Sequence, residues 1–167
     1  TKSENYKKNE NNGSDNLINE AYSIGGMSYG VTPLDMAEAY AAFANGGYHI
    51  ETHAVTKIEY RSSGKTVDFT ANKEKVMADS TAYLMNNVLQ YAVEHGFNGG
   101  ARVYGSTVAA KTGTSNLSDD VCRAKGIPIG SVNDLWTVAY TPEYSIALWY
   151  GYEKVDKDHY LGGASAP

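Results

Sequence analysis

Two stretches of the chain place apolar residues at helical spacing, and each stretch carries start and stop signals. The first begins at Pro33, after the capping residue Thr32, and ends at the Asn-Gly-Gly sequence of residues 45–47. The second begins at Asp79 and ends at the His-Gly sequence of residues 95–96. We expect the apolar residues of the second helix to form one broad buried face: Ala82, Leu84, Met85, Val88, Leu89 and Ala92.

Two short stretches with alternating apolar and polar residues predict a hairpin. They cover residues 54–60 and 66–69, and the turn sequence Ser62-Ser63-Gly64-Lys65 joins them. This tetrapeptide also fits the pattern Ser-x-x-Lys, in which a lysine one helical turn after a serine activates the serine as a nucleophile. A turn between strands does not stack the two side chains on one face, so we do not expect Ser62 to be a nucleophile.

The second half of the chain predicts a sheet. Three β-type runs are expected: Val108–Lys111, Leu135–Tyr140 and Tyr144–Tyr152. The tight turn at residues 141–143 predicts that the last two runs pair antiparallel, and Trp136 and Trp149 are expected in the core of the sheet. Residues 115–133 have no clear period. The order of all these elements predicts an α+β fold, with helices packed on an antiparallel sheet.

Composition and charge exclude some classes of protein. The chain has 167 residues, of which 42% are hydrophobic and 20% charged, as is typical of a folded domain. Its net charge of −5 and its lack of a dense Lys and Arg cluster argue against nucleic acid as a partner. Residues 1–16 are polar and rich in Asn, so we expect residues 1–20 to be a poorly ordered leader and residues 21–167 to be folded.

Residues that bind metals or form disulfides are sparse. Cys122 is the only cysteine, which excludes an intrachain disulfide, and we expect it to be an unreactive thiol in a loop. The four histidines lack the spacing of a metal-binding motif: His49, His53, His95 and His159. Asp119 and Asp120 are expected in a solvated loop. No metal or other cofactor is therefore expected.

The segment with the clearest chemistry is Lys111-Thr112-Gly113-Thr114-Ser115, at the end of an apolar run. Lys111 places a positive charge beside a site, and Gly113 has no side chain to block the approach of a substrate backbone. Thr112 and Thr114 add hydroxyl donors and acceptors. A strand edge of this composition suits the binding of a peptide carboxylate, with residues 111–115 as the candidate binding residues.

A longer pattern surrounds this segment. Lys-Thr-Gly is one of three motifs that β-lactamases and penicillin-binding proteins share. Residues 24–37 (IGGMSYGVTPLDMA) and 41–47 (AAFANGG) resemble the stretch that class A, or bifunctional, penicillin-binding proteins carry ahead of Lys-Thr-Gly. Residues 134–142 (DLWTVAYTP) and 147–152 (ALWYGY) resemble the two strands that follow it. Gly162 and Gly163 resemble the end of the domain, so the resemblance covers nearly all of residues 21–167.

The resemblance implies a peptidoglycan D,D-transpeptidase, a serine acyltransferase that joins stem peptides and is acylated by β-lactams. It implies the serine β-lactamase and penicillin-binding-protein fold, of which this chain is the C-terminal part. Lys111 would contact the serine of a Ser-x-Asn motif and attract the substrate carboxylate, which the hydroxyls of Thr112 and Thr114 would hold. The backbone N–H of Thr114 would be one of two oxyanion donors. Lys111 and Thr114 are therefore the candidate catalytic residues of this chain.

Several parts that the family requires are not recognised in the chain. The Ser-x-x-Lys nucleophile, two strands and the last helix are expected to lie outside it. Ser3-Glu4-Asn5 and Ser14-Asp15-Asn16 fit Ser-x-Asn, but they lie in the Asn-rich leader and closer to residue 30 than the family motif does. We interpret both as matches of composition. The N-terminal part of the same domain is thus an expected partner, beside stem peptides and β-lactams.

Two other functions remain open on the sequence alone. A D,D-carboxypeptidase or β-lactamase has the same fold and uses water in place of the acceptor amine, and a non-catalytic scaffold would only bind peptidoglycan. The resemblance of residues 30–37 favours the transpeptidase. It also implies a location at the extracytoplasmic face of the bacterial membrane, with an anchoring segment outside this chain.

Overall fold

The computed structural model describes residues 24–25, 30–96 and 98–162. The chain divides into two compact units, Thr1–Gly30 and Val31–Pro167, and every helix and strand named below lies in the second unit. The expected leader at residues 1–20 lies outside the described residues and stays a prediction.

Helix α2 (Pro33–Ala44) begins and ends where the sequence predicts. The Thr32 hydroxyl accepts a hydrogen bond from the Asp35 N–H at 3.1 Å, and the Asp35 carboxylate accepts one from the Thr32 N–H at 3.2 Å. This reciprocal pair satisfies two amide groups that the first turn leaves without a helical partner. At the other end, the Gly47 N–H donates to the Ala42 carbonyl at 2.8 Å and closes the helix.

Helix α3 (Asp79–His95) also lies where it is predicted, but the prediction of its buried face is partly wrong. Ala82, Leu89 and Val93 are buried, whereas Leu84 is 62% exposed and Val88 is 61% exposed. The reason is tertiary, because α3 packs against α2 and one strand of the sheet on a single side. Within the described residues, no element covers its other side, although that side is apolar.

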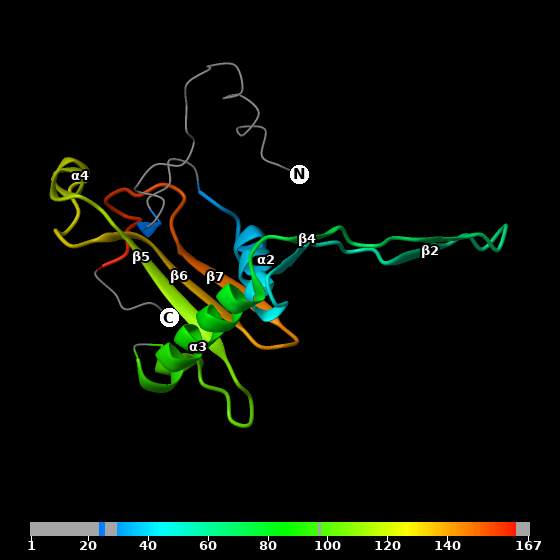
Figure 1. Ribbon diagram of the computed structural model, residues 1–167. Helices are drawn as coiled ribbons and strands as arrows, with labels where there is room; N and C mark the ends of the chain where they lie inside the picture. The colour runs from blue at the N-terminus through cyan, green and yellow to red at the C-terminus, as the bar shows by residue number, and fades with distance from the viewer. Residues whose placement is uncertain (1–23, 26–29, 97, 163–167) are drawn as a thin grey trace, which may run out of the picture. The chain divides into compact units, whose positions relative to one another are not determined.

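Two antiparallel strand pairs lie between α2 and α3 in the sequence, and the second pair is nested inside the first. Strands β1 (Tyr48–Ile50) and β4 (Lys73–Lys75) form a base next to α2. Strands β2 (Lys57–Glu59) and β3 (Thr66–Asp68) form the predicted hairpin, which runs outward from that base (Figure 1). The sequence pattern does not predict β1 and β4, because three-residue strands, one of them Lys-Glu-Lys, have no apolar period.

The main sheet has the strand order β5-β6-β7, and both pairs are antiparallel. Strands β6 (Val132–Tyr140) and β7 (Ser145–Gly151) confirm the predicted runs and the turn between them. Strand β5 (Ala109–Asn116) is longer than predicted, because it continues through the whole Lys-Thr-Gly segment. Figure 1 shows α3 lying across β5.

The core around the sheet is small. Leu89, Ala109 and Tyr140 form one buried cluster, and α2 adds Tyr40 and Phe43 to it. Burial raises the pKa of Tyr140 to about 12, and the nearby Tyr40 adds to this effect. The Tyr140 hydroxyl donates to the Asn86 amide oxygen at 2.7 Å, so the phenol is buried with its polar group satisfied.

The expectation that Trp136 and Trp149 lie in the core is wrong, because neither is among the buried residues. Trp136 and Trp149 face each other across β6 and β7, and Trp149 remains 37% exposed. On the sheet face that carries them, the buried cluster formed with the helices contains Ala109 and Tyr140, at the opposite end of β5 from Ser115. Periodicity identified the strands but could not show where helical cover ends.

Residues 115–133, for which no period was found, contain helix α4 (Asp119–Lys125). The Ser118 hydroxyl accepts from the Val121 N–H at 3.4 Å, and Gly126 ends the helix with a φ of 68°. Cys122 is fully buried on this helix and packs with Ile127. The expectation of a loop cysteine is therefore wrong, while its burial agrees with an inert thiol.

Candidate functional site

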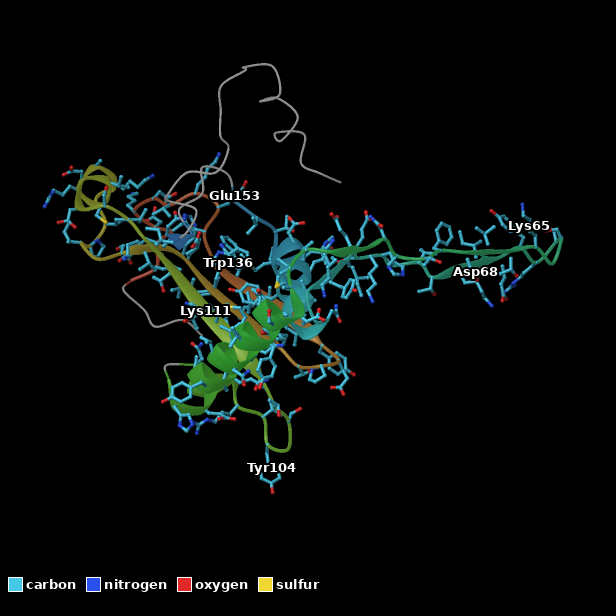
Figure 2. All side chains as sticks on the ribbon, in the orientation of Figure 1. Lys65, Asp68, Tyr104, Lys111, Trp136 and Glu153 are labelled. Atoms are coloured by element: carbon cyan, nitrogen blue, oxygen red, sulfur yellow. The ribbon has the colours of Figure 1, made fainter. Side chains whose placement is uncertain are left out.

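Lys111–Ser115 lies on β5, which is an edge strand of its sheet. Strand β6 pairs with one side of β5, and among the described residues no strand pairs with its other side. Lys111, Thr114 and Ser115 are exposed, while Thr112 and Gly113 are half-buried. Figure 2 shows Lys111 on the β5 ribbon. All five candidate residues are thus brought together on one accessible strand.

The hydrogen bonds of β5 show which backbone groups face its open edge. The Ala110 carbonyl accepts from the Asn98 side-chain amide at 2.9 Å, so it points away from β6. In an antiparallel pair, the N–H and C=O of one residue point to the same side, and the side alternates along the strand. Thr112 and Thr114, in register with Ala110, therefore present their N–H and C=O groups at the open edge. This is the edge at which an oxyanion or an extended peptide could pair.

The side chains of the segment make few contacts within the chain. The Lys111 ammonium group donates to the Thr112 carbonyl oxygen at 2.5 Å and is otherwise in solvent. The Thr112 hydroxyl lies 3.3 Å from the Asn98 amide oxygen. Among the described residues, no hydrogen bond of the Thr114 hydroxyl is found. The Lys111 ammonium group can therefore give up its hydrogen bond to the Thr112 carbonyl and bind a ligand carboxylate with little loss of free energy.

Gly113 is not a steric necessity of this fold. A Cβ built on it would lie 3.4 Å from the Trp136 Cβ, which is an ordinary contact distance. Its φ is not in the left-handed region. The close approach of a substrate backbone therefore stays the prediction that accounts for glycine at this position.

The Ser-x-x-Lys sequence at residues 62–65 lies in the turn between β2 and β3, as predicted. Ser62 and Ser63 belong to the turn, Gly64 has a φ of 67°, and the Ser63 hydroxyl accepts from the Lys65 N–H at 3.3 Å. Figure 2 shows Lys65 near the outer end of the hairpin, on a different part of the structure from Lys111. The Ser-x-Asn sequences beginning at Ser3 and Ser14 lie outside the described residues.

Histidines and acidic residues do not gather into a metal site in the described part of the chain. There, no group of three His, Cys, Asp or Glu side chains is placed to hold an ion. Asp119 and Asp120 lie in the first turn of α4, rather than in the predicted loop, and both pair with Arg123. In the same part of the chain, no helix has the length and apolar character needed to cross a bilayer.

Glu38 on α2 is a charged group with three contacts to residues far from it in the sequence. Its carboxylate contacts the His49 ring nitrogen, the Thr52 hydroxyl and the Thr52 N–H, the last at 3.1 Å. Burial acts to raise the pKa of Glu38, but the hydrogen bonds from Thr52 and His49 outweigh it, and the pKa is lowered. These contacts of Glu38 hold β1 and the segment that follows it against α2.

One cavity among the described residues lies beside Glu38 and His49, and none of Lys111–Ser115 lines it. It has a volume of about 450 Å³ and mostly apolar walls, from α2, α3 and the segment that follows β4. The second cavity, of about 90 Å³, lies between α3 and the ends of β5 and β6. Neither of these two cavities is lined by a residue of Lys111–Ser115.

Comparison with known proteins brings an independent line of evidence. The model of the penicillin-binding protein transpeptidase domain family matches residues 1–167. Penicillin-binding protein 1A/1B of Bacillus subtilis is 43% identical over 136 residues, which are 80% of this chain and 15% of that protein. Penicillin-binding protein 1A of Streptococcus oralis is 36% identical over 138 residues, or 82% of this chain and 22% of that protein. The chain spans about a fifth of the length of these relatives.

Solved structures agree with the fold. Penicillin-binding protein A of M. tuberculosis, as an imipenem acyl-enzyme complex, matches with a TM-score of 0.60 at 21% identity. The match covers 77% of this chain and 28% of that one. Penicillin-binding protein 3 of the same organism, in its apo form, matches with a TM-score of 0.61 at 21% identity, over 82% and 32% of the two chains. At these identities the likeness concerns the fold, and it confirms the predicted arrangement of helices on an antiparallel sheet.

Proposed function

Because this chain belongs to the family of penicillin-binding protein transpeptidase domains, we propose that it supplies the Lys-Thr-Gly wall of a peptidoglycan D,D-transpeptidase active site. The observation that carries the proposal is the open edge of β5. It presents the Lys111 ammonium group, the Thr114 hydroxyl and the Thr114 N–H on one accessible strand. These groups can bind a carboxylate and an oxyanion together.

The reaction uses these groups in two steps. A serine oxygen attacks the carbonyl carbon of the D-Ala-D-Ala peptide bond, an ester forms, and the terminal D-Ala leaves as the amine. The amine of a second stem peptide then attacks the ester carbon, a new peptide bond forms, and the serine recovers its proton. In both steps negative charge develops on the carbonyl oxygen, where the Thr114 N–H is one donor. Loss of one such donor typically costs about a hundredfold to a thousandfold in rate.

Lys111 acts on the substrate carboxylate. Its ammonium group attracts the terminal carboxylate of the donor peptide or the carboxylate of a β-lactam, and Thr112 and Thr114 hold it by hydrogen bonds. Gly113 and Ser115 complete the segment along which the peptide lies. Charge-assisted hydrogen bonds of this kind contribute about 1.5 to 3 kcal/mol each. The acyl-enzyme complex of the M. tuberculosis relative supports β-lactams as ligands of this site.

The serine nucleophile and the opposite wall come from sequence outside these 167 residues. Apolar surface supports this arrangement, because Ile146, Leu148 and Tyr150 lie on one face of β7 and are 65%, 49% and 55% exposed. An uncovered apolar stripe of this kind marks a surface that packs against another element. The N-terminal part of the same domain is the partner that covers it. The full-length protein acts at the extracytoplasmic face of the membrane, held by a segment outside this chain.

Labelling with a fluorescent penicillin tests the proposal. The full-length protein is expected to take covalent label, and Lys111→Ala is expected to slow labelling about tenfold to a hundredfold, as loss of one charge-assisted contact predicts. Lys65→Ala is the matched control, because it removes the other candidate lysine from the hairpin turn, and its labelling rate should not change.

The outcomes separate the alternatives. The isolated chain is expected to take no label, and label on Ser62 would contradict the assignment of residues 62–65 as a turn. A folded full-length protein that takes no label would be a scaffold. A protein that takes label and, in a separate assay with donor and acceptor stem peptides, hydrolyses the donor and releases D-Ala without a cross-linked product would be a D,D-carboxypeptidase.

A further inference from the structure

The side chain of Asn98 joins the loop after α3 to the Lys-Thr-Gly strand. Asn98 is 8% exposed, and among the described residues it and Ser131 are the only buried polar residues. Its amide nitrogen donates to the Ala110 carbonyl at 2.9 Å, and its amide oxygen lies 3.3 Å from the Thr112 hydroxyl. One buried amide thus touches β5 at two successive positions of its open edge.

The chemistry of the partners determines the direction of both hydrogen bonds. The Ala110 carbonyl can only accept, so the amide nitrogen of Asn98 must face it, and the amide oxygen must face Thr112. That oxygen can only accept, so the Thr112 hydroxyl is the donor. The distance of 3.3 Å is long for an O–H···O bond, which makes this contact weak. In this contact the Thr112 hydroxyl donates to Asn98, which then competes with a ligand for the same proton.

Asn98 itself is held in place by its backbone. Its N–H donates to the Ala92 carbonyl of α3 at 3.3 Å, and its carbonyl accepts from the Ala101 N–H at 3.0 Å. Close by, the Arg102 guanidinium donates to the Val93 carbonyl at 3.0 Å and caps the end of α3. The amide is therefore positioned before any ligand arrives.

We propose that Asn98 is a positioning residue for the Lys-Thr-Gly segment, with two effects on substrate binding. Its amide nitrogen donates to the Ala110 carbonyl, so that carbonyl is not free to accept from a substrate. An extended substrate backbone therefore pairs with β5 only from Thr112 onward. By accepting from the Thr112 hydroxyl, it competes with the carboxylate for that proton, so Thr114 becomes the stronger of the two hydroxyl donors to the carboxylate. This inference rests on the proposed function. In it, Asn98 sets the register in which the substrate backbone pairs with β5.

Acylation kinetics of the full-length protein test the inference. Asn98→Ala is expected to lower the second-order rate constant for penicillin acylation about tenfold, since two hydrogen bonds to β5 are lost. Arg102→Ala is the control: it loosens the same loop without removing a hydrogen bond to β5, so at a matched loss of melting temperature it should slow acylation much less than Asn98→Ala does. Thr112→Val combined with Asn98→Ala should slow acylation by less than the product of the two single effects.

Asn98→Asp supplies a rescue that a merely structural role would not show. A neutral carboxyl group has one O–H donor and one carbonyl acceptor, the same pattern as the amide, whereas a carboxylate would repel the Ala110 carbonyl. The acylation rate of this variant, relative to the unsubstituted protein, is therefore expected to rise as the pH falls from about 8 to about 5, because burial favours the neutral acid.

Two results would overturn the inference. One is an unchanged acylation rate in Asn98→Ala, and the other is an equal loss in Arg102→Ala at a matched melting temperature. If the unsubstituted protein takes no penicillin at all, the proposed function fails, and amide hydrogen exchange of residues 109–116 still tests Asn98. Faster exchange in Asn98→Ala than in Arg102→Ala supports the positioning role, and equal exchange contradicts it.

Discussion

Glu38 is expected to stabilise the base that β1 and β4 form next to α2. Its carboxylate accepts three contacts from His49 and Thr52, and its side chain is 19% exposed. Hydrogen bonds to a charged group contribute about 1.5 to 3 kcal/mol each when they are buried, and partial exposure reduces that. Glu38→Gln keeps the shape and one acceptor oxygen but removes the charge. We therefore expect local opening of this base to become easier by about 2 kcal/mol.

Amide hydrogen exchange measures this opening directly. The Thr52 N–H donates to the Glu38 carboxylate, so its exchange requires the contact to break. A change of about 2 kcal/mol corresponds to exchange roughly thirtyfold faster at neutral pH. Glu51→Gln is the matched control, since it makes the same charge change on an exposed side chain of the same segment.

The pH dependence has a definite sign. The pKa of Glu38 is lowered on folding, so the charge contributes stability above the unfolded pKa of about 4.5. That contribution is lost as the pH falls through the lower, folded pKa. The difference between Glu38→Gln and the unsubstituted protein should therefore shrink below about pH 4. A difference that stays constant or grows on acidification would refute the reasoning, as would unchanged exchange at pH 7.

Two further substitutions test the core and the end of α2. Tyr140→Phe should remove a phenol that titrates near pH 12, seen as a lost step in the absorbance at 295 nm, and the hydrogen bond to Asn86 should cost about 1 kcal/mol below pH 10. Because burial raises this pKa, the extra stability is complete below pH 10 and is lost as the pH rises through 12. Gly47→Ala should lower the melting temperature strongly, since its φ is 86° and a Cβ would lie 2.4 Å from the Met77 carbonyl oxygen. Gly46→Ala, with a φ of 63° and open space, should cost only about 1 kcal/mol; equal losses at both glycines would contradict the steric argument.

Local signals in the sequence were reliable where the structure they specify is also local. The start of α2 depends on hydrogen bonds between Thr32 and Asp35, three residues apart, and both residues can be read from the sequence. The hairpin turn at residues 62–65 depends on the φ of Gly64. The same kind of signal was present for α4, in the cap Ser118 and in Gly126, and it was overlooked because that helix is short.

Contacts between distant segments were not predictable in this way. A pattern of apolar residues predicted α3, but which of them are buried depends on the side against which α2 and β5 pack, so Leu84 and Val88 remain exposed. Asn98 lies in a Gly-rich loop and looks like a turn residue. Nothing in its neighbourhood indicates that its amide reaches a strand that begins eleven residues later.

The sequence by itself determined α2 and α3 with their ends, the hairpin of β2 and β3, and the motif at residues 111–115, because each depends on neighbouring residues and on the chemistry of side chains. Only the tertiary structure decided that β5 is an edge strand, which of its residues face outward, and what holds them there. The physical reason is that strand pairing satisfies one side of each backbone segment, and the side left open depends on which distant segments occupy the other.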